Sequence, residues 1–393
     1  MTATLSTTSD ALLGVYRKPP VEFVRGAGVE LFDSEGKAYL DCVAGIAVNA
    51  LGYGDAGLEQ AMRDAMDGSL IHTSNLYRTQ AGERLAEKLA ERSFADRVFF
   101  CNSGAEANEG AFKMARRWGR AVGGAPKHEI VALRGGFHGR LLGTLAATDR
   151  PQYRAPFRPL AGGISIAERD LEELRGALNA ETVAAVIAEP IQGEGGVRVL
   201  ETEFLKGLRE LTRERNILLI LDEIQCGYGR TGTFWAYEQA GIAPDILTVA
   251  KPMAGGLPMG AILSTSAVAD AMQAGDHGTT FGGGPFISSV ALHVLDRLSD
   301  PTLLANVRQR GDQVRTALSA LQASTTKVRA VRGMGLMWGI DVAEPAKTIV
   351  GRAMDLGLLI CSAGEHTIRL LPPLVVSSED VRRGIDLLGR AIG

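Results

Sequence analysis

The chain has 393 residues, 46% of them hydrophobic, and a formal net charge of −3. That length allows one large or two medium hydrophobic cores, and the small net charge excludes a global basic field that would recruit nucleic acid or anionic lipid. The four cysteines form no CxxC pair and no His/Cys cluster at zinc spacing, so we predict reduced thiols and no metal site.

The beginning of the chain is predicted to form a loose arm and then a β-hairpin. Residues 1 to about 15 form the arm; they lack the basic start of a secretory signal, and no apolar run in the chain is long enough to cross a bilayer. We therefore expect a cytoplasmic protein without membrane partners. Apolar runs at 29–32 and 38–40 flank the turn signal Asp33-Ser34-Glu35-Gly36, which is typical of a hairpin.

In the middle of the chain, short apolar runs alternate with helical patterns. We expect strands at 98–100, 129–133, 183–188, 217–221 and 246–249, and helices at 108–121 and 203–214. The helical spacing is carried by Phe112, Ala115 and Trp118 in the first helix and by Phe204, Leu208 and Leu211 in the second. Strands that alternate with helices predict an α/β fold with a largely parallel sheet covered on both faces.

After about residue 285 the pattern changes to long amphipathic helices at 288–298 and 303–321, followed by short strands around 334–341 and 367–371. This predicts a separate, smaller α+β domain. We expect residues 1–45 to be an N-terminal arm and hairpin that belong to the small domain, 46–284 to be the large domain, and 285–393 to be the C-terminal small domain. Parallel α/β sheets bind ligands at the carboxyl ends of their strands, so functional residues are sought after each apolar run.

The first such segment is suited to an anion. The strand at 98–100 is followed by Cys101-Asn102-Ser103-Gly104-Ala105-Glu106-Ala107-Asn108 and then a helix. A helix start of small residues presents free backbone N–H groups and the positive end of the helix dipole, which suits a phosphate. The alternative is an ordinary capped helix, with Asn102 or Ser103 as the cap.

The second segment is Arg134-Gly135-Gly136-Phe137-His138-Gly139-Arg140, after the strand at 129–133. The ring of Phe137 in a glycine-rich loop is suited to stacking on a flat heterocycle, and Arg140 is suited to clamping a carboxylate with its fork of donors. In the alternative interpretation, Phe137 only packs the loop and Arg140 is a solvated surface charge.

Two charged residues follow the next strands. Asp222 comes after five apolar residues, and a carboxylate is costly to bury there without a cationic partner such as a protonated pyridine nitrogen. A magnesium-binding acid and a helix N-cap are the alternatives, although the chain has no GxxxxGK[ST] loop. Lys251 follows the strand at 246–249, and burial there would lower its pKa and free the amine to attack an aldehyde. Alternatively, the lysine reaches to the surface.

A phosphate cradle, an aromatic lid, an acid for a ring nitrogen and an amine are together the parts that bind pyridoxal phosphate. The glycine-rich loops do not fit the GxGxxG dinucleotide pattern. We therefore predict pyridoxal 5'-phosphate as the cofactor.

From about residue 20 to residue 374, the chain resembles the class III (subgroup II, fold type I) aminotransferases, most closely those that act on acetylornithine. The matching segments are Tyr39–Asp41, Gly45–Asn49, His72–Leu76, Asn102–Asn108, Phe137–Arg140, Glu189–Gly196, Asp222–Gln225, Gly229–Gly232, Lys251 and His277–Gly283. The resemblance implies a large domain with a mixed, mostly parallel seven-stranded sheet sandwiched by helices, plus a smaller α+β domain.

The resemblance also implies residue roles. Lys251 forms a Schiff base with the cofactor and moves protons, and Asp222 pairs with the ring nitrogen. The cofactor-binding set is Ser103, Gly104, Ala105, Phe137, His138, Asp222, Gln225, Lys251 and Thr280. Thr280 reaches the phosphate from a neighbouring subunit, so a homodimer with shared active sites is implied. The substrate-binding set is Arg140, Glu194, Thr279 and Arg369, with Glu194 holding Arg369 until glutamate binds. Glu189 supports the Asp222 region.

The implied reaction interconverts N2-acetyl-L-ornithine and 2-oxoglutarate with N-acetyl-L-glutamate 5-semialdehyde and L-glutamate, a step of arginine biosynthesis. The alternatives are succinylornithine, ornithine, 4-aminobutyrate or carrier-linked aminoadipate semialdehyde as substrates, a non-catalytic relative, and a racemase or decarboxylase. The chain departs from the family pattern at Pro252, at Gly284 and at Tyr53-Gly54-Asp55-Ala56. These departures bear on substrate preference.

Overall fold

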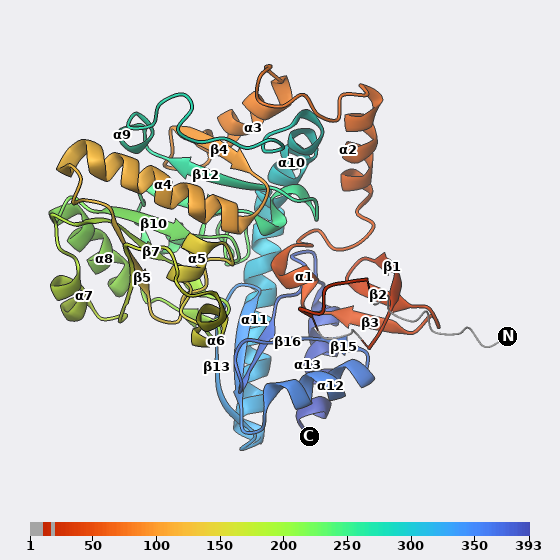
Figure 1. Cartoon of the computed structure of the whole chain (residues 1–393). Helices are drawn as coiled ribbons and strands as arrows, with labels where there is room; N and C mark the ends of the chain where they lie inside the picture. Colours follow the sequence, from red (N-terminus) through yellow and green to blue (C-terminus); the bar gives the residue numbers. More distant parts are fainter. Residues whose placement is uncertain (1–10, 17–19) are drawn as a thin grey trace.

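The computed structural model of the chain describes residues 11–16 and 20–393. Most of the predicted N-terminal arm therefore lies outside the described residues. A central seven-stranded sheet with its helices forms one part of the molecule, and two four-stranded sheets with their helices form the other (Figure 1). No helix among the described residues is long and apolar enough to cross a membrane.

The central sheet has the strand order β4-β12-β11-β10-β7-β5-β6. Its strands are β4 (Arg97–Cys101), β5 (Glu129–Leu133), β6 (Ile164–Ala167), β7 (Val183–Ala188), β10 (Leu218–Asp222), β11 (Ile246–Val249) and β12 (Gly260–Ser264). Only β12 is antiparallel to its neighbours, β11 and β4. The predicted mixed, mostly parallel sheet of seven strands is confirmed. The alternating pattern had indicated five of these strands and missed β6 and β12.

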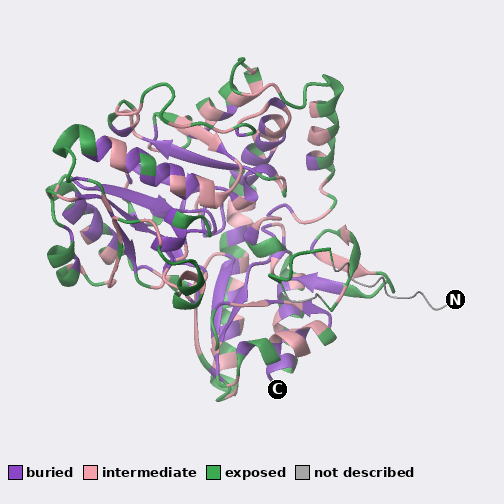
Figure 2. Cartoon of the chain, in the orientation of Figure 1, coloured by how far each residue is buried: buried purple, intermediate pink, exposed green. Residues whose placement is uncertain are grey.

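Helices cover both faces of the central sheet because the strand side chains alternate between two apolar layers. Ile220 of β10 packs with Trp118 of α4 (Gly104–Gly123) on one face. Its neighbour Leu219 packs in the opposite cluster with Leu208 of α8 (Thr202–Glu214). Figure 2 shows the resulting pattern, with buried strands between helices whose outer surfaces are exposed. The predicted apolar stripes are buried as expected, except that Phe204 is only half-buried.

Helix α4 begins at Gly104, four residues earlier than the sequence pattern indicated. Ser103 is its N-cap, and the Ser103 hydroxyl accepts a hydrogen bond from the backbone N–H of Glu106 at 3.2 Å. The small residues of the first turn carry no apolar periodicity, so the pattern could not detect this turn. The predicted cap at Ser103 is thus confirmed, and it leaves the first backbone N–H groups of the helix directed out of its end.

The other sheets join the two ends of the chain. The hairpin strands β1 (Phe23–Ala27), β2 (Glu30–Asp33) and β3 (Ala38–Asp41) are extended by β15 (Leu358–Leu359), which pairs in parallel with β3. The predicted hairpin is confirmed. A second, antiparallel sheet has the order β13-β14-β17-β16 and contains β13 (Val328–Met334), β14 (Met337–Val342), β16 (Cys361–Ser362) and β17 (Thr367–Leu370).

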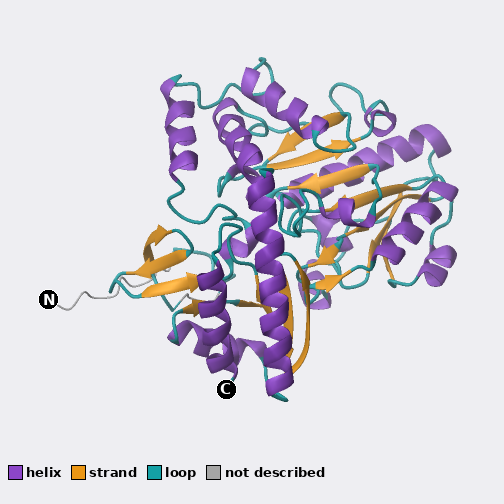
Figure 3. Ribbon diagram, turned by 180° about the vertical axis from the view of Figure 1, so that it is seen from behind, coloured by secondary structure: helices purple, strands orange, loops and turns teal. Residues whose placement is uncertain are grey.

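Long helices pack on these sheets and on the central part. Helix α11 (Pro301–Ser324) runs along β13 of the second sheet and packs against α13 (Ser378–Ile392), which in turn packs against α12 (Ala346–Asp355) (Figure 3). Helix α10 (Pro285–Leu298) packs against α2 (Ala56–Asp67) and α3 (Gln80–Glu91). The domain boundaries at residues 45 and 284 stay a prediction.

The remaining elements are short. They are α1 (Ala44–Ala47), α5 (Leu142–Ala147), α6 (Pro151–Arg154), η1 (Ala155–Phe157), α7 (Leu171–Ala177), β8 (Ile191–Gln192), β9 (Arg198–Val199), η2 (Ala236–Ala240), η3 (Lys251–Ala254) and α9 (Ser266–Ala269). Asp55, one of the departures from the family pattern, is the N-cap of α2, because its side chain accepts a hydrogen bond from the backbone N–H of Leu58 at 2.8 Å. All four cysteines are free.

The close approach of α4 to its neighbours gives a first testable prediction. A Cβ at Gly119 would lie 2.2 Å from the carbonyl oxygen of Lys127 and 3.0 Å from the Cβ of Ala184. We expect Gly119→Ala to lower the free energy of unfolding by about 1–3 kcal/mol, because a backbone carbonyl must move. Urea denaturation of the purified protein measures the change.

The matched control is a helix glycine with open surroundings. A Cβ at Gly351, inside α12, meets nothing within 4 Å. Gly351→Ala should therefore raise stability by up to about 1 kcal/mol through helix propensity alone. Equal effects of the two substitutions would contradict the packing described here.

Candidate active site

A cavity of about 410 Å³ opens at the carboxyl edge of the central sheet. Segments that follow β4, β5, β10 and β11 all contribute to its wall, as is usual for ligand sites in α/β sheets. Of the residues singled out from the sequence, the wall contains Ser103, Gly104, Ala105, Phe137, His138, Arg140, Asp222, Gln225 and Lys251. The volume suits a small organic ligand.

The start of α4 forms one end of the cavity. Backbone N–H groups of its first turn and the dipole of a 20-residue helix favour an anion there. The one acid in that turn, Glu106, accepts from the backbone N–H and the side-chain amide of Asn102, at 2.8 and 2.9 Å. A Cβ at Gly104 would lie 2.7 Å from the side chain of Ile224, so glycine lets the loop after β10 pack beneath the helix start.

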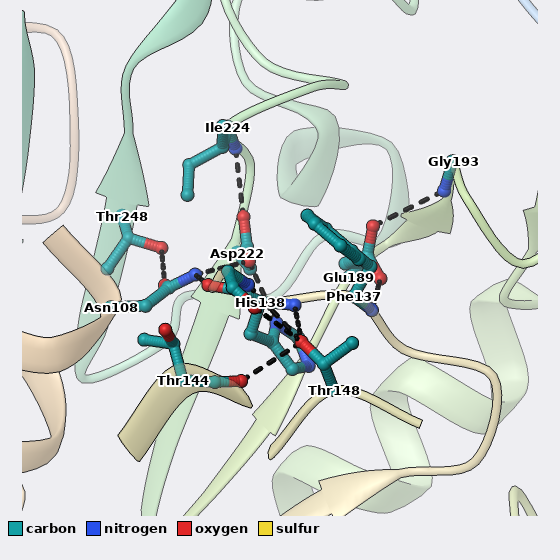
Figure 4. Close-up of polar contacts among 11 residues, drawn as sticks. Asn108, Phe137, His138, Thr144, Thr148, Glu189, Gly193, Asp222, Ile224 and Thr248 are labelled. Carbon is teal, nitrogen blue, oxygen red and sulfur yellow. Dashed lines mark hydrogen bonds and ion pairs between the residues drawn. The ribbon is translucent and has the colours of Figure 1, made fainter. Parts of the chain in front are cut away.

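Asp222 is the last residue of β10 and is only 4% exposed. Its Oδ2 accepts from Nδ2 of Asn108 at 2.7 Å and lies 2.8 Å from Nδ1 of His138, and its Oδ1 accepts from the backbone N–H of Ile224 at 3.1 Å (Figure 4). Asn108 is itself held by the hydroxyl of Thr248, at 2.7 Å. Asp222 caps no helix, so the N-cap alternative is wrong.

Lys251 follows β11 and lines the same cavity as Asp222. Burial lowers the pKa of Lys251, while the charges of Asp222 and Glu194 oppose that shift. A lowered pKa increases the fraction of neutral amine, which is the nucleophilic form. Pro252 lies in the first turn of the short helix η3, where a missing N–H costs no helical hydrogen bond. This departure is thus compatible with the local backbone.

Glu189 ties two loops of the site together. Its carboxylate accepts from the backbone N–H of Phe137 at 2.9 Å and from that of Gly193 at 3.3 Å. Burial raises the pKa of Glu189 to about 7. Phe137 and Arg140 both line the cavity, and the Arg140 guanidinium also lies 3.5 Å from the ring centre of Tyr153.

The ion pair between Glu194 and Arg369 contacts Gln225, which lines the cavity. Nη1 of Arg369, on β17, donates to Oε1 of Glu194 at 2.5 Å and to Oε1 of Gln225 at 3.0 Å. The Arg369 side chain is 2% exposed and that of Glu194 is 28% exposed. The arginine is therefore the fixed partner, and the glutamate is the one with room to move.

The two threonines predicted from the sequence, Thr279 and Thr280, are not among the described residues that line the cavity. The Thr279 hydroxyl accepts from Nδ2 of Asn102 at 3.2 Å, next to the cavity. Thr280 is exposed and is not among the residues that line the cavity of the described chain. Sequence reasoning gave no role of their own to Asn108 and Thr248, which orient Asp222. An asparagine on the buried, otherwise apolar face of a helix was the signal that could have found the first of them.

Glu223, the neighbour of Asp222, provides a pH test of the site region. It is 1% exposed and accepts from the backbone N–H groups of Ala236 and Tyr237 at 2.6 and 2.8 Å. Burial raises the pKa of Glu223 from 4.5 to about 8. The folded protein therefore holds a proton that the unfolded chain releases, and this group's contribution to stability is lost as pH rises through that window.

We expect Glu223→Gln, which cannot ionise, to gain stability relative to the unsubstituted protein as pH rises from about 5 to 8. Urea unfolding at several pH values measures the difference. Glu214→Gln is the control, because the Glu214 side chain is 66% exposed. Parallel pH profiles for the Glu223→Gln and unsubstituted proteins would contradict a protonated Glu223.

The chain matches known proteins along nearly its whole length. The family model for aminotransferase class-III matches residues 15–392. Acetylornithine aminotransferase of Gloeobacter violaceus is 46% identical over 380 residues, which cover 96% of this chain and 94% of that protein.

Two solved structures show the same arrangement. N-acetylornithine aminotransferase from Stenotrophomonas maltophilia superposes with a TM-score of 0.84 at 38% identity, covering 96% of both chains. Ornithine aminotransferase from Toxoplasma gondii, with PLP at partial occupancy in its active site, gives a TM-score of 0.94 at 30% identity and covers 98% of this chain and 92% of that one. The chain belongs to the class III aminotransferase family.

Proposed function

We propose that the protein is a transaminase that interconverts N2-acetyl-L-ornithine and 2-oxoglutarate with N-acetyl-L-glutamate 5-semialdehyde and L-glutamate. The similarity to acetylornithine aminotransferases supports the substrate. The observation that carries the proposal is the shared cavity, in which the half-buried Lys251, with its lowered pKa, and the buried carboxylate of Asp222 lie with the start of α4.

The cofactor is pyridoxal 5'-phosphate, and the side chains present fit it. The start of α4 offers N–H groups to a phosphate, Asp222 offers an acceptor to a ring N–H, and Lys251 offers an amine to an aldehyde. When bound, the cofactor supplies an electron sink. We assign it the cavity residues of the sequence set, and Thr280 from a second subunit.

The roles of the protein groups follow from their atoms. In one half-reaction, Nζ of Lys251 accepts the proton of the substrate carbon that bears the reacting amine and would deliver it to the cofactor; in the other half-reaction it moves a proton in the opposite direction. Asn108 and His138 hold the Asp222 carboxylate in one orientation, so that it can accept from a ring N–H. The low exposure of this cluster excludes water and strengthens these interactions.

Two arginines recognise substrate carboxylates. Arg140 lies at the cavity wall and takes a carboxylate of either substrate, with Thr279 close by. Arg369 takes the second carboxylate of glutamate. Glu194 neutralises Arg369 while the acylated ornithine is bound and turns away when glutamate enters. The greater exposure of Glu194 than of Arg369 supports a fixed arginine and a movable glutamate.

The chemistry depends on one amine. We expect Lys251→Ala to lower kcat by at least about 10³-fold, because general acid–base catalysis by a placed side chain is worth about 10²–10⁴. Steady-state kinetics with glutamate and 2-oxoglutarate measure the loss. Borohydride treatment should label Lys251 covalently in the unsubstituted protein. Full activity of Lys251→Ala, or a label on another side chain, would overturn the proposal.

The substrate is tested with a panel of amino donors and 2-oxoglutarate as acceptor. The panel contains N2-acetylornithine, N2-succinylornithine, ornithine, 4-aminobutyrate and a carrier-linked aminoadipate derivative. We expect the highest kcat/KM for N2-acetylornithine. A higher kcat/KM for another donor would identify that donor as the substrate, and the assignment of the protein as a transaminase would stand.

We also propose a homodimer in the cytoplasm. Five large apolar side chains are exposed within residues 66–77, among them Leu76 at 84% and Tyr77 at 72%, and Phe281, next to Thr280 in the chain, is 63% exposed. The rings of His72 and Phe281 are 5.1 Å apart, so the two segments form one surface. A patch of this kind is typical of a protein interface.

We expect Leu76→Asp to shift the protein from dimer towards monomer in sedimentation velocity, because a charge would be desolvated at the interface. Val122→Asp is the control, since Val122 is 49% exposed but lies at the far end of α4. A monomeric unsubstituted protein would refute the dimer.

A further inference from the structure

A row of residues crosses the second sheet and carries the site arginine. Arg332 of β13 lies opposite Gly339 of β14, Gly339 lies opposite Arg369 of β17, and Arg369 lies opposite Cys361 of β16. Residues that oppose one another across neighbouring strands project to the same face of a sheet. The row therefore presents two arginines on one face, with a gap between them where Gly339 has no side chain.

The loop that carries Glu194 fills this gap. A Cβ at Gly339 would lie 2.9 Å from the Cβ of Val197 and 3.0 Å from the carbonyl oxygen of Gly196. Val197 is fully buried and has a φ of 52°. A β-branched residue adopts such a backbone conformation only where its surroundings enforce it. The loop is thus pressed onto the sheet between Arg332 and Arg369.

Arg332 holds this loop by its backbone. Its Nε donates to the carbonyl oxygen of Gly196 at 2.7 Å, and its two Nη atoms donate to the carboxylate of Asp341 at 2.7 and 2.8 Å. Asp341 also accepts from the hydroxyl of Thr367 at 2.6 Å. The paired contact with Asp341 fixes the plane of the guanidinium and aims Nε at Gly196.

The loop is held at a second point close to Glu194. A guanidinium N–H of Arg150 donates to the backbone carbonyl of Glu194, from the loop region beyond β5. The loop backbone is therefore anchored at the carbonyl of Glu194 by Arg150 and, two residues further on, at the carbonyl of Gly196 by Arg332. The Glu194 side chain is left as the mobile part, and its carboxylate meets Arg369 in the same cross-strand row.

We propose that Arg332 is a positioning residue that fixes the Glu194 loop on the second sheet and thereby sets the preference of the site between its two substrates. The inference rests on the proposed function, in which Glu194 neutralises Arg369 while the acylated ornithine is bound. A loosened loop leaves Arg369 without its partner in that complex, and an unpaired buried charge is costly. The complex with glutamate, which supplies its own carboxylate, is less affected.

Arg332→Gln tests the inference, because glutamine lacks the paired contact with Asp341 and the aimed Nε. We expect the ratio of kcat/KM for N2-acetylornithine to kcat/KM for glutamate to fall about tenfold, the equivalent of one hydrogen bond to a charged donor. Arg332→Lys keeps the charge beside Asp341, and it should give a smaller fall in the ratio. Single-turnover measurements of each half-reaction with the holoenzyme provide both values.

The chain offers a closely matched control. Arg352 also pairs both Nη atoms with an acid, Glu344, and its Nε donates to a backbone carbonyl, that of Ala391, at 2.6 Å. That carbonyl belongs to α13 and not to the site. Arg352→Gln should therefore leave the substrate ratio within about twofold. A shift equal to that of Arg332→Gln would reduce Arg332 to a general stabilising residue and overturn the inference.

A second measurement does not depend on the substrate. Hydrogen exchange in the full-length protein without substrate should be faster at the amides of residues 193–197 in Arg332→Gln than in Arg352→Gln. Gly339→Ala, whose new Cβ meets the loop, should have the same effect with Arg332 intact, and it replaces Arg332→Gln if that variant does not fold. Unchanged exchange and an unchanged ratio would overturn the inference. Faster exchange in a protein that transaminates no member of the panel would overturn only the proposed function.

Discussion

The carboxylate of Asp222 is buried at the end of the central strand β10, and donors from three separate segments meet on it. Asn108 comes from α4, His138 from the loop after β5, and Ile224 from the turn that follows β10 itself. A buried carboxylate is tolerated only when it is satisfied in this way. Helix, loop and strand are consequently held in one relation to each other, and the cavity forms at that junction.

Burial and the neighbouring charges together set the pKa values of the groups around the cavity. It lowers the pKa of Lys251 and raises that of Glu189, while the nearby acids act on Lys251 in the opposite direction. Perturbed groups that share one cavity are typical of catalytic sites. Asp222, which holds helix, loop and strand together, thus also raises the pKa of the Lys251 amine.

The second sheet completes the site by delivering Arg369 from a part of the chain that is remote in sequence. Its guanidinium meets Glu194 and Gln225, which belong to loops of the central part. Gly339 makes this meeting possible, because the Glu194 loop rests where its side chain would be. In the proposed function, recognition of two different substrates therefore depends on how a loop of the central part is seated on the face of the second sheet.

The amino-acid sequence by itself determined the buried strands β5, β7, β10 and β11 and the residues that follow them, because an uninterrupted apolar run ending in a polar residue is a local signal. It also carried the family motifs, and hence the cofactor and the class of reaction.

The tertiary structure alone decided which distant groups meet. The early start of α4 has no apolar period to reveal it. The run at 261–263 is apolar, but nothing in it shows that β12 is inserted antiparallel between β11 and β4. Two hydrogen bonds join residues more than a hundred positions apart, from Thr248 to Asn108 and from Arg332 to Gly196. Such contacts depend on how whole sheets pack, and packing is a property of the folded chain that no local pattern of residues expresses.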